Sequence, residues 1–137
     1  MSGVLVDTGF LVSLFRPSDR LRKQARECLA ANRHPLITAA PVIVETCFFL
    51  DTDAKGRLLE WVQRGALTVV DVTVGAYAEI NAVLRKYADR NIDFADAALV
   101  WLAAQTGIRG ILTVDESDFA VFRLKGGKRF ELLRWYR

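Results

Sequence analysis

Short apolar segments alternate with longer segments of helical spacing along the chain of 137 residues. Four of the short segments read GVLV (3–6), LIT (36–38), LTVV (67–70) and GILTV (110–114), and a fifth is expected at 130–136. A short, continuously apolar run is typical of a strand that is buried on both faces of a parallel sheet. The alternation therefore predicts an α/β layer fold with a mainly parallel sheet.

The segments between these strands carry the start and stop signals of helices. Thr8 is expected to cap the first helix, and Pro41 is suited to the first turn of another. Gly65 and Gly107 follow helical patterns and are expected to end them. No linker, repeat or low-complexity stretch divides the chain, so we expect one domain over residues 1–137. The expected helices are 8–15, 19–32, 41–50, 52–63, 74–88 and 93–106.

Composition excludes several classes of protein. An apolar fraction of 52% with 3 Pro and 9 Gly excludes a disordered or collagen-like chain. Cys28, Cys47 and His34 are too few for a zinc site or a disulfide framework, and the cysteines are expected to be small core side chains. No apolar run approaches the roughly 18 residues of a spanning helix. The N-terminal segment lacks a basic region and contains Asp7, so we expect a cytoplasmic protein without a membrane partner.

Charge is distributed unevenly along the chain. Residues 1–118 carry 13 Lys and Arg against 15 Asp and Glu, whereas residues 119–137 carry 6 against a single Glu. A basic tail on a slightly acidic body suits an anionic partner, although a solvated terminus accounts for the charge equally well. Within this tail, Lys125, Lys128 and Arg129 form a short basic loop that is the candidate contact for the phosphate groups of such a partner.

Four acidic residues occupy positions where acids are unusual. Asp7 and Asp115 directly follow the apolar runs VLV and ILTV, which places them at the carboxyl ends of two buried strands. Glu45 and Asp96 lie on apolar faces of predicted helices. A lone carboxylate on an apolar face is costly unless it is paired, metal-bound or protonated. These four residues are therefore candidates for one site.

Each acid also has a purely structural explanation. Asp7 could cap the following helix, and Glu45 could pair with an arginine. Asp96 could answer Asp93, the N-cap of its helix, in a variant of the capping box. Asp115 could be a turn residue in TVDESD. Four such acids together are harder to explain in this way than any one alone.

Convergent carboxylates repel one another, and a divalent cation removes that repulsion. A set of oxygen ligands without His or Cys points to Mg²⁺ or Mn²⁺ rather than Zn²⁺. Mg²⁺ held by a few carboxylates also accepts phosphate oxygens, so the expected chemistry is metal-assisted hydrolysis of a phosphodiester.

The ordered set LVDTGFLVSLF, VIVET, DFADAALVWLA and ILTVDESDF resembles the PIN domains, and within them the VapC toxins of toxin–antitoxin pairs. The resemblance spans nearly the whole chain. It implies a three-layer α/β/α domain with a five-stranded parallel sheet and a Mg²⁺- or Mn²⁺-dependent endoribonuclease activity. It also implies a homodimer and a small antitoxin that neutralises the toxin.

The resemblance also implies roles for individual residues. The catalytic and metal-binding set would be Asp7, Glu45, Asp96 and Asp115. Thr8, Thr113, Asp93 and Asp118 match positions expected to support that set, although Asp93 is equally well explained as a helix cap. Gly9 departs from the family, in which serine or another small residue is common. Two alternatives stay open: a PIN nuclease of RNA processing without an antitoxin, and a non-catalytic binding module.

Overall fold

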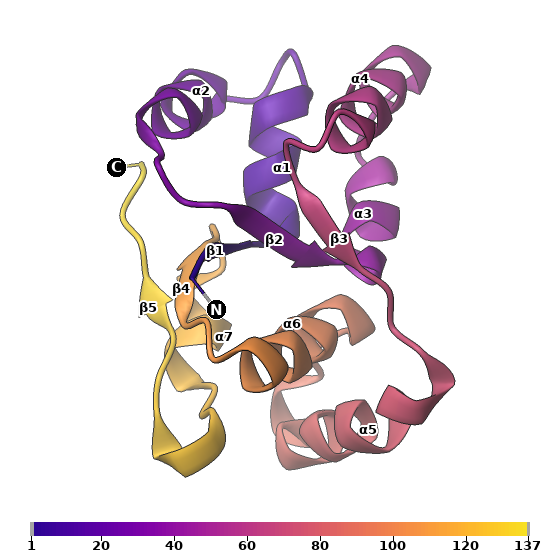
Figure 1. Cartoon of the computed structure of the whole chain (residues 1–137), viewed down its shortest axis with the longest axis vertical. Coiled ribbons are helices and arrows are strands. Elements are labelled where there is room, and N and C mark those ends of the chain that lie inside the picture. The colour runs from indigo at the N-terminus through magenta and orange to yellow at the C-terminus, as the bar shows by residue number, and fades with distance from the viewer. Residues whose placement is uncertain (1, 137) are drawn as a thin grey trace.

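The computed structural model describes residues 2–136 and contains a five-stranded, wholly parallel sheet in the order β3-β2-β1-β4-β5 (Figure 1). This confirms the predicted fold class. Arg137, counted above in the basic tail, and Met1 lie outside the described residues. The strands are β1 (Val4–Val6), β2 (Leu36–Ala39), β3 (Thr68–Val70), β4 (Gly110–Leu112) and β5 (Glu131–Leu132).

Helices cover both faces of the sheet. In Figure 1, α1 to α4 lie above the sheet and α5 and α6 lie below it. The described α-helices are α1 (Thr8–Phe15), α2 (Arg22–Ala31), α3 (Ala40–Cys47), α4 (Thr52–Gln63), α5 (Tyr77–Lys86), α6 (Phe94–Thr106) and α7 (Glu116–Val121). Short 3-10 turns precede α5 (η1, Val74–Ala76), follow α5 (η2, Ala88–Arg90) and precede β5 (η3, Lys125–Gly127).

The central strands and helices are buried because their sequences are apolar on every side. All three residues of β1 are buried, and so are seven of the eight residues of α1. Helix α6 is apolar around its circumference and packs against α5, α3 and β2. It ends at Gly107, whose φ of 74° is the left-handed conformation that glycine adopts without a Cβ penalty. No helix within residues 2–136 is both long and apolar enough to cross a membrane.

Several local expectations differ from the structure. Asp7, not Thr8, caps α1, because the Asp7 carboxylate accepts a hydrogen bond from the Thr8 N–H. The helix expected at 74–88 is interrupted, since α5 covers only Tyr77–Lys86 and 3-10 turns flank it. The strand expected at 130–136 pairs with β4 only at Glu131–Leu132.

No helix was predicted in the turn-rich segment TVDESD after β4, but the structure places the short helix α7 there. Asp115 caps this helix by accepting a hydrogen bond of 3.1 Å from the Asp118 N–H. Asp115 therefore has a structural role as a helix N-cap, close to the turn role considered for it above.

Candidate active site

Asp7 and Asp115 meet at the carboxyl edge of the sheet because their strands are neighbours. β1 pairs in parallel with β4, with Val6 opposite Leu112, and each acid follows shortly after its strand. From β1 the chain proceeds to β2 and β3 on one side, and later to β4 and β5 on the other. Such a switch point in strand order leaves a crevice at the carboxyl edge, which is where open α/β sheets bind ligands.

The Asp7 carboxylate is held in one orientation by two hydrogen bonds. Its Oδ1 accepts from the Thr8 N–H at 2.8 Å, and its Oδ2 accepts from the Thr113 hydroxyl at 2.7 Å. The same Thr113 oxygen accepts from the Asp115 N–H at 2.8 Å. Thr113 therefore joins the ends of β1 and β4, and Asp7 is buried, with 4% of its surface exposed.

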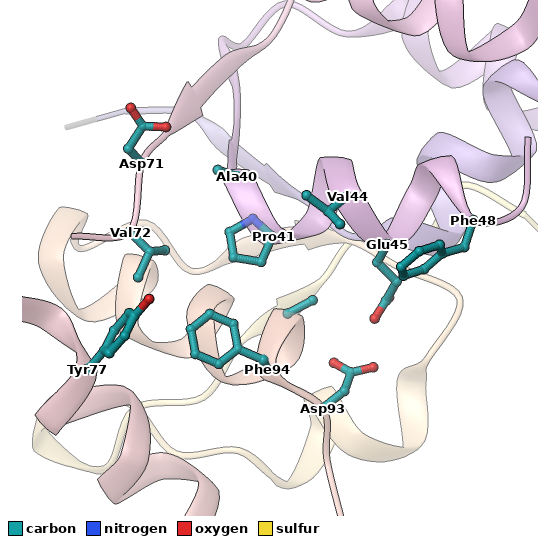
Figure 2. Close-up of a pocket in the computed structure, with 11 residues that line it drawn as sticks. Ala40, Pro41, Val44, Glu45, Phe48, Asp71, Val72, Tyr77, Asp93 and Phe94 are labelled. Atoms are coloured by element: carbon teal, nitrogen blue, oxygen red, sulfur yellow. The ribbon is translucent and has the colours of Figure 1, made fainter. Parts of the chain in front are cut away.

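Glu45 and Asp96 reach the same edge from two helices. Helix α3 follows β2 directly and carries Glu45, while α6 begins there with Asp93 as its cap, accepting from the Asp96 N–H at 2.9 Å. In Figure 2 the carboxylates of Glu45 and Asp93 point toward each other. Among the described residues, no reciprocal bond joins the Asp96 side chain to the Asp93 N–H. The capping box does not account for Asp96, which is only 8% exposed.

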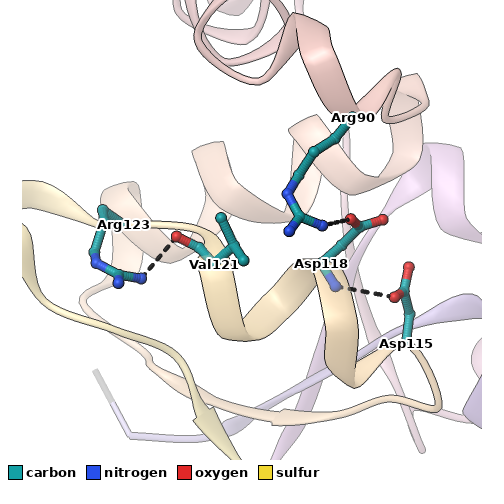
Figure 3. A network of polar contacts seen from close by, with 5 residues as sticks. All are labelled: Arg90, Asp115, Asp118, Val121 and Arg123. Carbon is teal, nitrogen blue, oxygen red and sulfur yellow. Dashed lines mark hydrogen bonds and ion pairs between the residues drawn. The ribbon is translucent and has the colours of Figure 1, made fainter.

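Asp118 was expected only to support the site, but its carboxylate lies next to those of Asp96 and Asp115. One carboxylate oxygen each from Asp96, Asp115 and Asp118 lie within 4.8 Å of one another. Arg90 Nη1 contacts Asp118 Oδ1 at 2.7 Å (Figure 3). The resemblance to PIN domains implied a supporting role for Asp118, but the helix α7 that places it near Asp96 was not predicted.

All four predicted acids line one open cavity of about 420 Å³. None of them is in an ion pair, because the ion pairs within residues 2–136 are Arg57–Asp53 and Arg90–Asp118. The arginine partner considered for Glu45 is therefore not found in the described part of the chain. The structure therefore brings together four partly or wholly buried carboxylates, none of which is paired with a Lys or Arg of residues 2–136.

Burial and repulsion between the carboxylates raise the pKa values of these four acids. Burial raises the pKa of Asp7 to about 6, although the hydrogen bond from Thr113 opposes the shift. Burial raises the pKa of Asp96 to about 8, with the Asp7 carboxylate as the second cause. Burial and the neighbouring Asp93 carboxylate raise the pKa of Glu45 to about 7. Burial likewise raises the pKa of Asp115, against the Asp118 N–H that lowers it.

The site has the donors that a hard divalent cation requires. Its candidate ligands are carboxylate oxygens, which Mg²⁺ and Mn²⁺ prefer, and the raised pKa values show that these carboxylates need positive charge to ionise together. The Thr8 hydroxyl oxygen is also buried there and has no hydrogen-bond partner among residues 2–136. A buried, unpartnered oxygen beside clustered carboxylates fits a site that is completed by a cation and its waters.

Comparison with known proteins identifies the family of the chain. The profile of the PIN domain family matches residues 4–123. The chain belongs to the PIN domain family. It is similar to Ribonuclease VapC26 of Mycobacterium tuberculosis, with 28% identity over 134 residues that cover 95% of this chain and 99% of the relative.

Two solved structures share the PIN domain fold of the chain. One is the sarcin–ricin loop cleaving toxin VapC20 of Mycobacterium tuberculosis, with a TM-score of 0.73 and 21% identity over 80% of this chain and 87% of that one. The other is a toxin–antitoxin complex from Klebsiella pneumoniae, with a TM-score of 0.63 and 18% identity over 88% of this chain and 92% of that one.

The basic loop of this PIN domain lies away from its acidic cavity. Lys125 and Lys128 line a separate cavity with Gly107 and Arg109, which precede the amino end of β4. Because the acids lie at the carboxyl end of the same strand, the two features occupy opposite edges of the sheet. The structure therefore does not bring Lys125, Lys128 and Arg129 to the carboxylates.

Close packing explains why this PIN domain has glycine at position 9. A Cβ on Gly9 would lie 2.2 Å from Val114 Cγ2, so a serine or alanine would require Val114 to move. Val114 lies between Thr113 and Asp115, which are both involved in the acidic site. Glycine at position 9 leaves room for the Val114 side chain.

Proposed function

We propose that the protein is a metal-dependent endoribonuclease that hydrolyses RNA phosphodiester bonds. The observation that carries the proposal is the single cavity in which Asp7, Glu45, Asp96 and Asp115 converge without an ion-pair partner in the described chain. Membership of the PIN domain family and the similarity to Ribonuclease VapC26 support RNA as the substrate. The ion is proposed to be Mg²⁺ or Mn²⁺, because the ligands are oxygen atoms.

The proposed ligands are Asp7, Asp96 and Asp115, with Asp118 available beside them. Asp7 is oriented by Thr8 and Thr113, so its carboxylate enters the site with little conformational freedom left to lose. The Asp118 carboxylate forms an ion pair with Arg90, which reduces the negative charge that Asp118 adds to the site. Asp93 holds the first turn of α6 and thereby fixes the position of Asp96.

Glu45 is proposed to orient the attacking water and accept its proton. Without a bound ion, burial raises the pKa of Glu45 to about 7, and an acid with a pKa near the working pH can both accept and release a proton. A divalent ion, when bound, would lower the pKa of the water and offset the negative charge of the phosphate. The proton would then pass to the Glu45 carboxylate as the water oxygen bonds to phosphorus. The opposite P–O bond would break, and the leaving ribose oxygen would take a proton from solvent. No histidine is needed, in agreement with the exposed position of His34.

We further propose that the nuclease is a VapC-like toxin of the cytoplasm and is neutralised by a small antitoxin protein. The similarity to VapC26 and the fold shared with a toxin–antitoxin complex support this choice. A PIN nuclease of RNA processing would use the same carboxylates without an antitoxin. Expression of the protein alone should arrest growth, and co-expression with the product of an adjacent small reading frame should restore it. Unimpaired growth on expression of the active nuclease would favour the RNA-processing alternative.

A second copy of the chain is the proposed occupant of an apolar surface beside the acidic site. A cavity of about 550 Å³ is lined by Val44, Phe48, Tyr77 and Phe94, whose side chains are 40% to 80% exposed (Figure 2). Glu45 and Asp93 line this cavity as well as the acidic one. Size-exclusion chromatography with light scattering should show a dimer that Phe48→Asp dissociates. Leu59→Asp, at an exposed leucine of α4, is the control that should leave it intact.

Incubation with total RNA tests the nuclease proposal. The purified protein should cleave RNA with Mn²⁺ or Mg²⁺ and lose this activity with EDTA. Asp7→Asn should abolish metal-dependent cleavage and keep the circular dichroism spectrum of the parent, because asparagine preserves the shape of the side chain. Undiminished cleavage by Asp7→Asn would refute the proposed site, and absence of cleavage by the parent protein would refute the function.

A further inference from the structure

The acidic cavity continues along one face of α1 to a basic end. Gly9, Val12, Ser13 and Arg16 recur at helical spacing and all line the cavity, together with Arg20 in the following turn. The cavity thus has acidic residues at the start of α1 and two arginines at and beyond its end. An RNA strand that lies in it would meet the carboxylates and the arginines at different positions.

The two arginines are available to an outside anion. Arg16 and Arg20 are exposed, and neither takes part in an ion pair within residues 2–136. Asp19 lies between them and also lines the cavity, but its Oδ1 accepts a hydrogen bond of 2.9 Å from the Leu21 N–H and so orders the turn. Two guanidinium groups and one carboxylate leave this end of the cavity with net positive charge.

Phe49 adds an aromatic side chain to the same cavity. It is 52% exposed and follows α3 in a turn that its N–H closes by bonding to the Thr46 carbonyl at 3.0 Å. Its neighbour Phe48 lines the apolar cavity instead, so the two phenylalanines serve different surfaces. Unpaired bases of single-stranded RNA stack on exposed aromatic side chains, while arginines contact the phosphates.

We propose that Arg16, Arg20 and Phe49 form a subsite for a nucleotide next to the cleaved bond, an inference that rests on the proposed nuclease function. The arginines bind a phosphate other than the one that is cleaved, and Phe49 stacks on a base. The helical rise of 1.5 Å per residue separates the backbones of Thr8 and Arg16 by about 12 Å, which is more than one phosphate group extends. The subsite therefore selects a single-stranded segment and sets its register.

A charge-matched pair of double variants tests the arginines. Arg16→Gln with Arg20→Gln should raise KM for a short single-stranded RNA that contains a mapped cleavage site by about 10-fold or more, with kcat within about 3-fold. The slope of log KM against log salt should become shallower by about 0.7 for each phosphate contact that is lost. Arg64→Gln with Arg85→Gln removes the same charge from exposed positions that do not line the acidic cavity, and should change neither quantity.

A combination of protein and RNA changes tests Phe49. Phe49→Ala should raise KM by about 5-fold to 150-fold, the range of base stacking on an aromatic ring, and Phe49→Trp should restore it. In a scan of RNAs that each carry one abasic nucleotide, a single position should abolish the difference between the parent and Phe49→Ala. If the difference in KM between the parent and Phe49→Ala is the same for every abasic RNA, Phe49 does not stack on a particular base.

The outcomes separate this inference from the function on which it rests. If the parent protein cleaves no RNA, the nuclease proposal fails. If the parent cleaves RNA and the double variant at Arg16 and Arg20 keeps the parent KM and salt dependence, the nuclease proposal stands and the subsite is refuted.

Discussion

The two edges of the sheet carry charge of opposite sign in different surroundings. At the carboxyl edge, buried acids share a cavity and have no ion-pair partner in the described chain. At the amino edge, the basic loop at 125–129 exposes its side chains to solvent and lines a cavity whose described lining contains no acid. Charge buried in a cavity costs free energy unless a ligand compensates it, whereas exposed charge costs little. Strand direction, rather than the count of charges, thus indicates where the chemistry lies.

The largest expected effect is at the carboxyl edge. Asp96→Asn should lower RNA cleavage by about 1000-fold, because loss of the ion removes several kcal/mol of charge stabilisation from the transition state. Asp53→Asn, at an exposed acid of α4, is the matched control and should leave the rate unchanged. Rates should be measured at saturating Mn²⁺ on the same RNA. Equal rates for the two variants would remove the distinction between buried and exposed acids.

The acidic edge should also make the metal-free protein less stable as pH rises. Asp96 has a pKa of about 8 in the fold and 3.8 as its ordinary value, so its contribution to stability is complete below about pH 4 and is lost as pH rises toward 8. In EDTA, the melting temperature should fall by several degrees between about pH 5 and pH 8. Mn²⁺ should oppose this fall by stabilising the ionised carboxylates, and Asp96→Asn should reduce it. A metal-free melting temperature that rises over this range would contradict the assignment.

A smaller effect is expected at the basic edge. The loop at Lys125, Lys128 and Arg129 stays a proposed phosphate contact, but its position limits it to RNA that extends beyond the acidic cavity. Replacing all three by Gln should weaken binding of a long structured RNA by less than about 10-fold and leave a short RNA unaffected. Fluorescence anisotropy at two salt concentrations checks both. A loss of short-RNA binding would place the loop in the main binding surface.

The smallest effect is expected for the link between β1 and β4. Thr113→Val removes the hydroxyl that donates to Asp7 and accepts from the Asp115 N–H, which should cost about 1 kcal/mol of unfolding free energy. The pKa of Asp7 should rise further, because the lost hydrogen bond lowers it. The apparent pKa of the pH–rate profile should move upward, whereas Thr106→Val, which removes a local helix bond, should not move it.

The fold was predictable because its signals are local. The runs VLV and GIL are apolar throughout, and such runs suit strands that are covered on both faces. Asp7 and Asp115 stood out since an acid that follows a buried apolar run lies near the carboxyl end of the sheet. Glu45 and Asp96 stood out because their helical neighbours are apolar.

The remaining features depend on contacts between distant parts of the chain. Asp7 and Thr113 are 106 residues apart, and nothing in either segment specifies their hydrogen bond. α7 was missed because the residues that favour a turn in DESD are also those that cap and begin a short helix. The approach of Asp118 to Asp96 and Arg90 follows from that helix, so it was missed for the same reason.

The segment that follows β5 connects one tryptophan to the site. Trp135 is buried, contacts Phe10 edge to face at 4.9 Å, and donates its indole N–H to the Thr113 carbonyl at 3.1 Å. It lies beyond the segment that matches the family profile, which ends at residue 123. Because indole emission depends on its hydrogen bond and local field, the chain carries an intrinsic optical reporter next to the residue that joins Asp7 to Asp115. Its fluorescence offers a way to follow ion binding without a label or a substrate.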